Sequence, residues 1–300
     1  MAVTILVAFA TAVLGLCYGL LLGGISRKVM ARIHGRIGPP VTQNFSDLVK
    51  LFFKRTAIEH GGMFWLAPMF RLTGGLGVLF LVPIVVGRFS VVNISFAGDL
   101  LLVVYFMFFG CLGMALGAGD SGHPHAVMAV SRGLAQMSTY ELSFSMVVLV
   151  LAVGLGTLNI GDIVAAQSGG IGQWNLVRYP FATAAAMIAF LPMQMAYPFS
   201  VVLAPQEIPI GPPTEYGSRF LSLMLAGRSI FGVAKLVLYM NLFFGGASNI
   251  ADLVMKTLLL YLYPVFVSAV FPRFRLEQSV RFLLVVPTVL ALVELIRVIT

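Results

Sequence analysis

The chain has 300 residues, of which 59% are apolar and 10% are charged, whereas a water-soluble domain needs roughly 25% charged residues to cover its surface. Its formal net charge of +8 would suit a nucleic-acid-binding protein only if the basic residues formed a solvated face, which so apolar a chain does not offer. We therefore predict an all-α integral membrane protein, a single transmembrane domain over residues 1–300, with lipid around it and no nucleic-acid partner.

About eight apolar segments are long enough to cross a bilayer, whose apolar core of about 30 Å requires about 20 residues of helix. They span residues 3–25, 69–87, 100–118, 126–158, 181–203, 218–246, 252–271 and 282–298. The first lacks the basic start and the cleavage site of a signal peptide, so we expect it to be retained. After it, residues 43–55 predict a short amphipathic helix that lies along the cytoplasmic membrane interface, with Ser46 as its N-cap.

The distribution of Lys and Arg predicts the orientation in the membrane. Of the 19 basic residues, thirteen fall in the connections on one side of this topology and four on the other. The thirteen include Arg71, which we place at the start of the second segment. Because basic residues near helix ends stay in the cytoplasm, we expect a protein of the cell membrane with both termini on the outer side.

The cytoplasmic connections are rich in glycine, proline and charge, which indicates more than simple linkers. A docking surface for partner subunits, or the lining of a substrate chamber, is our main interpretation, and turn formation alone is the simpler alternative. Arginines in proline-rich loops can make bidentate contacts with partner carboxylates. The candidate docking residues are Arg36, Asp47, Lys50, Arg132, Arg273 and Arg275.

The chain offers no pattern that would hold a redox cofactor. A membrane haem needs histidines at matching depth on facing helices, but His34, His60, His123 and His125 all fall in cytoplasmic connections. Cys17 and Cys111 lie far apart within apolar segments and form no metal-binding spacing. We predict no metal, no cofactor and no catalytic residue in this chain.

Charged residues within the spans are the candidates for an ion path, because an ion in the membrane is costly and is usually paired or functional. Ser138, Glu141 and Ser145 share one face of the fourth span, and Arg228, Gly232, Lys235 and Tyr239 share one face of the sixth. One interpretation is a static ion pair between the two helices. The other is a hydrated path on which Glu141 exchanges protons. Glu207 and Glu215 either flank its mouth or are simply solvated.

Four motifs in the cytoplasmic connections carry a resemblance to a known family. They are HGRIGPP at 34–40, SRGLAQMSTYE at 131–141, YPFSVVLAPQEIPIGPPTEYGS at 197–218 and FPRFRLEQ at 271–278. In this order they resemble subunit one of respiratory complex I and the equivalent anchor of energy-converting hydrogenases, and the Gly-Pro-Pro at 211–213 is closer to the hydrogenase type. The sequence departs from the family at Ser200 and Pro205, where carboxylates are usual.

The resemblance implies a membrane anchor subunit of a ferredoxin-linked respiratory complex of the membrane-bound hydrogenase type. Such a subunit connects a peripheral electron-transfer arm to proton or sodium translocation. Its partners would be iron–sulfur and hydrogenase-like subunits, which carry iron–sulfur clusters and in a hydrogenase a nickel–iron centre, and antiporter-like membrane subunits. A quinone-site subunit of complex I, a sulfur-reductase variant of the complex and a stand-alone secondary transporter are the alternatives.

Overall fold

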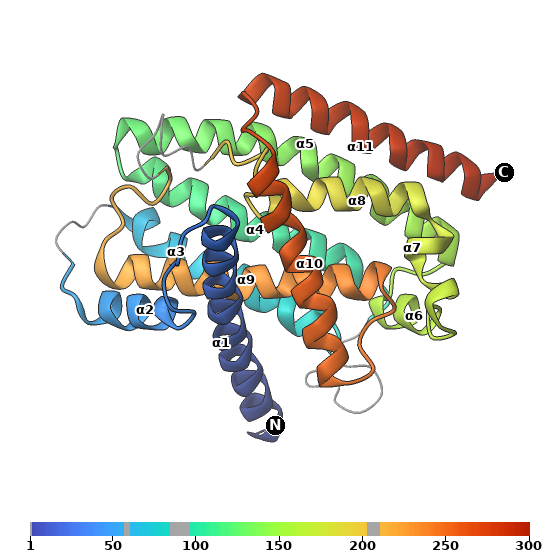
Figure 1. Cartoon of the computed structure of the whole chain (residues 1–300), viewed down its shortest axis with the longest axis horizontal. Coiled ribbons are helices and arrows are strands. Elements are labelled where there is room, and N and C mark those ends of the chain that lie inside the picture. Colours follow the sequence, from blue (N-terminus) through green and yellow to red (C-terminus); the bar gives the residue numbers. More distant parts are fainter. Residues whose placement is uncertain (1, 57–60, 85–95, 203–210) are drawn as a thin grey trace.

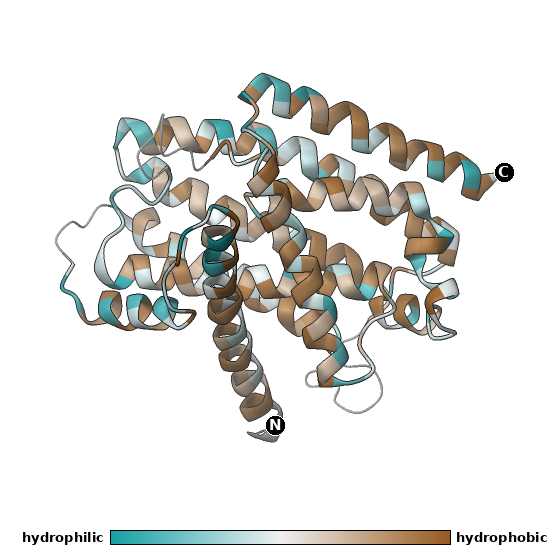
Figure 2. Ribbon diagram, viewed as in Figure 1, coloured by the Kyte–Doolittle hydropathy of each residue, from teal (hydrophilic) through white to brown (hydrophobic). Residues whose placement is uncertain are grey.

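The computed structural model describes residues 2–56, 61–84, 96–202 and 211–300, and within these ranges it contains helices and no strand. Seven helices in the described part are long and apolar enough to cross a membrane, and α8 (Pro180–Met193) is apolar but shorter. The seven are α1 (Ala2–Ile33), α3 (Gly62–Leu81), α4 (Asp99–Asp120), α5 (Pro124–Leu155), α9 (Ser218–Phe243), α10 (Ile250–Val270) and α11 (Leu276–Ile299). The prediction of an all-α, multi-pass membrane protein is confirmed, and the ribbons are apolar along most of their length (Figure 2).

The bundle is built around α9, which packs against α1, α3 and α10 (Figure 1). Helices α5, α8 and α11 pack on one another and form a second group. The two groups meet at Tyr239 of α9, whose ring centroid lies 5.5 Å from that of Phe144 on α5 and 4.5 Å from that of Phe190 on α8. These three side chains are almost wholly buried and so fix the relation between the groups.

Small residues bring α1 close to its neighbours. A Cβ atom at Gly19 would lie 2.5 Å from the carbonyl oxygen of Ser229 on α9, and one at Gly23 would lie 2.7 Å from the Asn44 amide nitrogen. Glycines spaced four residues apart form one face of a helix and allow close approach in membrane proteins. The α1 glycine face therefore places α9 and the segment after α1 directly against the first span.

The predicted amphipathic helix is α2 (Gln43–Phe53), which has no buried residue. The N-cap is Thr42, without a side-chain cap bond, and Ser46 lies inside the helix, so that detail of the prediction was wrong. The Asn44 amide donates to the Leu20 carbonyl at 2.9 Å, and the Ser222 hydroxyl donates to the Leu48 carbonyl at 3.1 Å. The helix is thus fastened to α1 and α9.

Two span boundaries differ from the prediction. The fifth span was expected to run to residue 203, but α8 ends at Met193 and the following residues to 202 are not helical. Pro198 disfavours the helical conformation of the residue before it, and this stretch is nevertheless buried, so hydropathy alone could not separate it from the helix. The second span begins earlier than expected, at Gly62.

That earlier start moves Arg71 from a cytoplasmic connection into the middle of α3, where its side chain is only 6% exposed. The second span was predicted to begin at residue 69, whereas α3 begins at Gly62 and continues through Pro68. The number of basic residues predicted on the cytoplasmic side falls from thirteen to twelve, against four on the other side, so the asymmetry behind the predicted orientation is retained.

The remaining short elements lie between α5 and α8. They are α6 (Ile160–Ala165), a 3-10 turn (Ile171–Gln173) and α7 (Asn175–Arg178). The Asn159 side chain accepts hydrogen bonds from the backbone of Gly161 and Asp162 and so caps α6. The buried Gln167 amide donates to the Asn241 carbonyl at 2.9 Å, which ties this connection to the end of α9.

Candidate functional site

Lys235 is the most enclosed cation of the predicted ion path. It lies on α9, its side chain is 6% exposed, and its Nζ donates a hydrogen bond of 2.6 Å to the Met193 carbonyl at the end of α8. The Nζ atom also lies 4.2 Å from the centroid of the Phe231 ring. A helix C-terminus and an aromatic face both attract a cation, and among the described residues no acidic side chain forms an ion pair with Lys235.

Glu141 lies half-buried on α5, between the exposed residues Ser138 and Ser145. Among the described residues, no ion pair within 4.0 Å involves Glu141, although the charge of Lys235 is near enough to act on it electrostatically. The two charges are therefore neighbours that do not touch. The structure shows no contact of the kind that the static ion pair requires.

The other residues of the α9 face enter different surroundings. The Tyr239 hydroxyl donates to the Ala186 carbonyl at 3.2 Å, within the buried aromatic cluster. Arg228 is exposed and lines a cavity of about 900 Å³. Helical spacing alone could not reveal this division, because Arg228 and Lys235 face different neighbouring helices.

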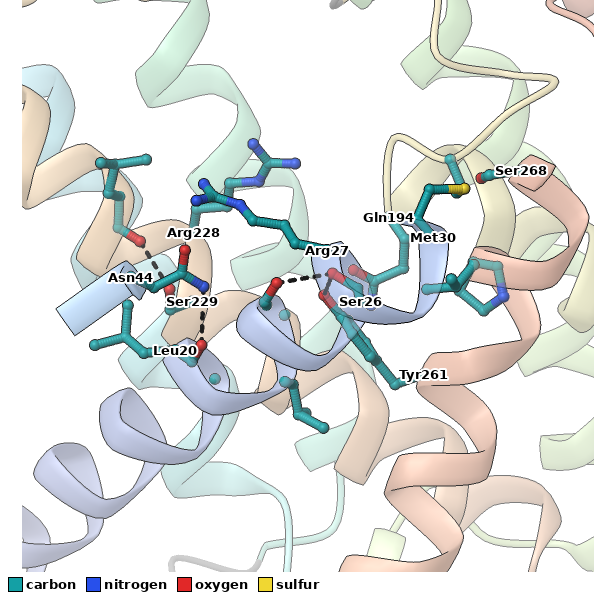
Figure 3. Close-up of a pocket in the computed structure, with 18 of the residues that line it drawn as sticks. Leu20, Ser26, Arg27, Met30, Asn44, Gln194, Arg228, Ser229, Tyr261 and Ser268 are labelled. Carbon is teal, nitrogen blue, oxygen red and sulfur yellow. Dashed lines mark hydrogen bonds between the residues drawn. The ribbon is translucent and has the colours of Figure 1, made fainter. Parts of the chain in front are cut away.

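The cavity lies between α1, α2, α9 and α10, with Gln194 and Ala196 from the segment after α8 (Figure 3). The predicted docking residues Arg36 and Asp47 both line it, and the side chains of Arg27 and Arg228 extend into it from α1 and α9. Asp47 accepts a hydrogen bond of 2.9 Å from Gln43 and pairs with Arg27 at 3.5 Å. Sequence analysis did not single out Arg27, because the cavity joins segments that are far apart in the chain.

The third of the connections predicted to be cytoplasmic is held by Tyr216, which the sequence places in a family motif without a role. Its ring stacks on Phe64 at a centroid distance of 4.1 Å, and its hydroxyl donates to the Phe64 carbonyl at 3.0 Å. The Phe64 amide in turn donates to the Asp120 carboxylate at 2.9 Å. Burial, together with the nearby charge of Asp120, raises the pKa of the Tyr216 hydroxyl, which therefore stays protonated as a donor.

The two glutamates predicted at the mouth of the path are in this same connection. Glu215 is half-buried next to Tyr216. Glu207 lies outside the described residues.

The remaining docking candidates are distributed over the same end of the bundle. Lys50 and Arg275 are exposed, and Arg132 is half-buried on α5. Arg273 donates to the Tyr197 hydroxyl at 3.0 Å and to the Ser200 hydroxyl at 3.3 Å, so part of its binding capacity is used inside the chain. Ser200 stands where the family usually has a carboxylate, and the structure shows that this position faces an arginine.

Two buried acids were not singled out from the sequence, although Glu294 falls within the predicted eighth span and Asp99 directly precedes the predicted third span. Glu294 on α11 is fully buried, accepts a hydrogen bond of 2.7 Å from the Phe181 amide and pairs with Arg297 at 2.9 Å. Asp99 at the start of α4 accepts from the Ile160 amide at 2.9 Å. Both carboxylates satisfy the first turn of a neighbouring helix, which is a structural role.

The histidines of the described chain make local contacts. The His123 ring accepts from the His125 amide at 3.2 Å and caps α5, and the His34 ring contacts the Met30 carbonyl at 2.8 Å. In the described residues, no three His, Cys, Asp or Glu side chains are grouped as a metal site would require. His60 lies outside the described residues.

The fold is that of a multi-pass membrane protein with ionisable groups buried inside the bundle. A family model described as NADH dehydrogenase matches residues 3–299, and the chain belongs to that family, which includes subunit one of complex I. It is 31% identical to hydrogenase-4 component C of Escherichia coli (strain K12) over 82% of this chain and 78% of that protein. It is 28% identical to an NADH-quinone oxidoreductase subunit of Mesorhizobium japonicum, over 85% of this chain and 82% of the relative.

A solved structure with the same fold belongs to the membrane-bound sulfane sulfur reductase, an archaeal respiratory membrane complex. The TM-score is 0.92 at 29% identity, and the match covers 98% of this chain and 99% of that one. The resemblance drawn from the four sequence motifs is thereby confirmed, and so is the prediction of a membrane anchor of a respiratory complex.

Proposed function

We propose that this chain is the membrane anchor of a ferredoxin-linked complex of the membrane-bound hydrogenase type. In this proposal it resides in the cytoplasmic membrane with both termini outside and connects a peripheral electron-transfer arm to proton or sodium translocation. The buried Lys235 is the observation that carries the proposal. An ionisable side chain enclosed within a span, beside a carboxylate that it does not contact, is typical of an ion path.

The partners in this proposal are iron–sulfur and hydrogenase-like subunits on the cytoplasmic side and antiporter-like subunits in the membrane. The end of the bundle that carries α2 offers exposed Arg36, Lys50 and Arg275, next to Asp47, Arg132 and the partly engaged Arg273. The redox groups are in the partners, namely iron–sulfur clusters and, in a hydrogenase, nickel–iron. In this proposal the residues of this chain bind and orient the partner subunits and carry the charges of the ion path.

The coupling in this proposal is indirect. Electron transfer in the peripheral arm changes the charge or shape of the surface that contacts the cytoplasmic connections. The third connection passes the change to α3 and α4 through the Tyr216–Phe64–Asp120 contact. The change in these contacts shifts the balance between the protonated and the ionised form of Glu141, beside Lys235. The size of the shift is limited by how differently the peripheral arm interacts with the chain in these two forms.

Purification of the intact complex in a gentle detergent, followed by metal analysis, tests the proposal. We expect the chain to come out with iron-containing partners and with nickel. Iron without nickel would instead favour the sulfur-reductase variant, which the fold match to the sulfane sulfur reductase supports. Recovery of the chain alone, without iron, would overturn both proposals in favour of a stand-alone transporter.

A quinone-reducing complex is a further candidate, because the cavity of about 900 Å³ is large enough for a headgroup. Its test is extraction of the pure complex with organic solvent. A stoichiometric quinone would support this candidate over the hydrogenase type. The serine at position 200, in place of a carboxylate, counts against it.

A further inference from the structure

The cavity between α1, α2, α9 and α10 carries more positive than negative charge. Among the described residues that line it are three arginines, Arg27, Arg36 and Arg228, and one carboxylate, that of Asp47. Asp47 pairs with Arg27. In the described part of the chain, Arg36 and Arg228 make no ion pair with an acidic side chain. The cavity therefore favours an anionic occupant.

The positive charge of Arg228 is costly because this residue lies deep within the membrane-spanning helix α9. It is the eleventh residue of α9, and at 1.5 Å per residue its Cα lies about 15 Å from the start of the helix. A guanidinium group at that depth requires water or an anion, and Figure 3 shows it directed toward the same part of the cavity as Arg27. Arg27 and Arg228 line the same cavity from different helices, and guanidinium groups bind phosphate oxygens through paired N–H donors.

The rest of the lining is that of a site for an amphiphile. Apolar side chains cover the walls on α1, α9 and α10, including Leu22, Val233 and Val265. Ser26, Tyr261 and Asn44 add hydroxyl and amide groups near the arginines. Only 22% of the most apolar window of α1, and likewise of α10, is buried within the chain, so two of the walls belong to helices that face outward.

We propose that this cavity binds one anionic glycerophospholipid, with its phosphate between Arg228 and Arg27 and its acyl chains along α1 and α10. The net negative headgroup neutralises the excess charge, whereas a zwitterionic headgroup such as phosphatidylcholine brings its own cation and leaves the excess in place. The chains cover the apolar walls. This inference goes beyond the anchoring function and holds for a complex of the hydrogenase or the sulfur-reductase type; a quinone bound in the same cavity would exclude it.

The test uses the intact complex, delipidated in detergent and returned to nanodiscs of phosphatidylcholine with a minor share of phosphatidylglycerol. Native mass spectrometry then counts the lipids that each preparation retains after detergent release. We expect one phosphatidylglycerol per complex to remain bound, and Arg228→Gln to weaken its retention by about tenfold or more, as for loss of a charged hydrogen bond. Arg228→Lys should keep part of the binding, because the charge persists without the planar geometry.

The matched control is Arg178→Gln, which removes an exposed arginine that does not line the cavity and should leave retention unchanged. A photoactivatable phosphatidylglycerol applied to the unmodified complex gives a second measurement that needs no variant. Its cross-links should map to peptides of α1, α9 and α10.

Three results would overturn the proposal. One is equal retention of phosphatidylcholine, and another is displacement of the bound lipid by millimolar inorganic phosphate, which would identify a site for the free anion. The third is an absence of cross-links to α1, α9 and α10, which would mean that carboxylates of a partner subunit neutralise the arginines.

Discussion

The Lys235 ammonium group and the Met193 carbonyl form a hydrogen bond of 2.6 Å that joins the centre of α9 to the end of α8. The bond exists because α8 stops at Met193, well before the apolar segment does, and leaves its last carbonyls free to accept. The shortened fifth span and the buried cation of the ion path therefore depend on each other.

Replacing Lys235 with Met tests whether the charge serves transport. Methionine fills a similar volume and leaves only a carbonyl without its donor, so we expect assembly to persist with a loss of about 1–2 kcal/mol in stability. Ion uptake per electron should fall sharply. Uptake is measured with a pH-sensitive or sodium-sensitive dye in vesicles. The control is Lys256→Met, which removes a lysine paired with Asp252. Unchanged pumping by Lys235→Met would show that the Lys235 charge has no role in ion transport.

Replacing Glu141 with Gln preserves shape and removes ionisation. Because no described residue forms an ion pair with Glu141, we expect normal assembly, and a strong fall in ions moved per electron even where electron transfer persists in the peripheral arm. Glu277→Gln, at an exposed site at the start of α11, is the matched control. Poor assembly or lower thermal stability of Glu141→Gln would favour a structural role instead.

Lys235 and Arg228 share one face of α9 in the sequence pattern but have different surroundings in the structure, which shows what the sequence can and cannot predict. Hydropathy placed the spans, and motif order identified the family, because both are encoded locally in the chain. The surroundings of each charge were not predictable in this way. Arg71 is buried within α3, which begins seven residues before the predicted span, and the cavity lies where the glycines of α1 allow α9 and α2 to approach.

The Ser200 hydroxyl lies 3.3 Å from the Arg273 side chain, so Ser200→Asp should place a carboxylate in reach of a guanidinium group. We expect the variant to raise the stability of the complex by about 1 kcal/mol, since charged hydrogen bonds are stronger than neutral ones. Thermal unfolding followed at low and high salt measures this. Ser200→Asn is the control of equal size. If Ser200→Asp is no more stable than Ser200→Asn, Arg273 does not bind the carboxylate at position 200.

The predicted orientation is open to cysteine labelling with a reagent that cannot cross the membrane. Lys50 and Ser168 are exposed and lie on opposite sides of the predicted topology. Lys50→Cys should react only in inverted vesicles, and Ser168→Cys only in right-side-out vesicles. Cys17 and Cys111 are partly buried within spans and set the background. Reaction of Lys50→Cys from the outer face would reverse the whole topology.

Tyr216 joins the third connection to the first turn of α3, and its loss should weaken coupling more than folding. Tyr216→Phe keeps the stack on Phe64 and removes the hydrogen bond to the Phe64 carbonyl, at a cost of about 1 kcal/mol. Because the pKa of Tyr216 is raised above its ordinary value near 10, the hydroxyl of the unmodified protein stays protonated, and the difference between the two proteins should not change between about pH 6 and 9.

Gly117→Ala provides a stronger perturbation of the same contact, because a Cβ atom there would collide with the Tyr216 hydroxyl and with Ala67. We expect Gly117→Ala to displace the connection and to lower ions moved per electron further than Tyr216→Phe. Gly119→Ala is the control, since a Cβ atom at that position meets open space on the same helix. The measurement is the number of ions moved per electron in vesicles for each of the two variants. If Gly117→Ala pumps as well as Gly119→Ala, the third connection does not transmit the signal through Tyr216, and the coupling must reach α9 by another element.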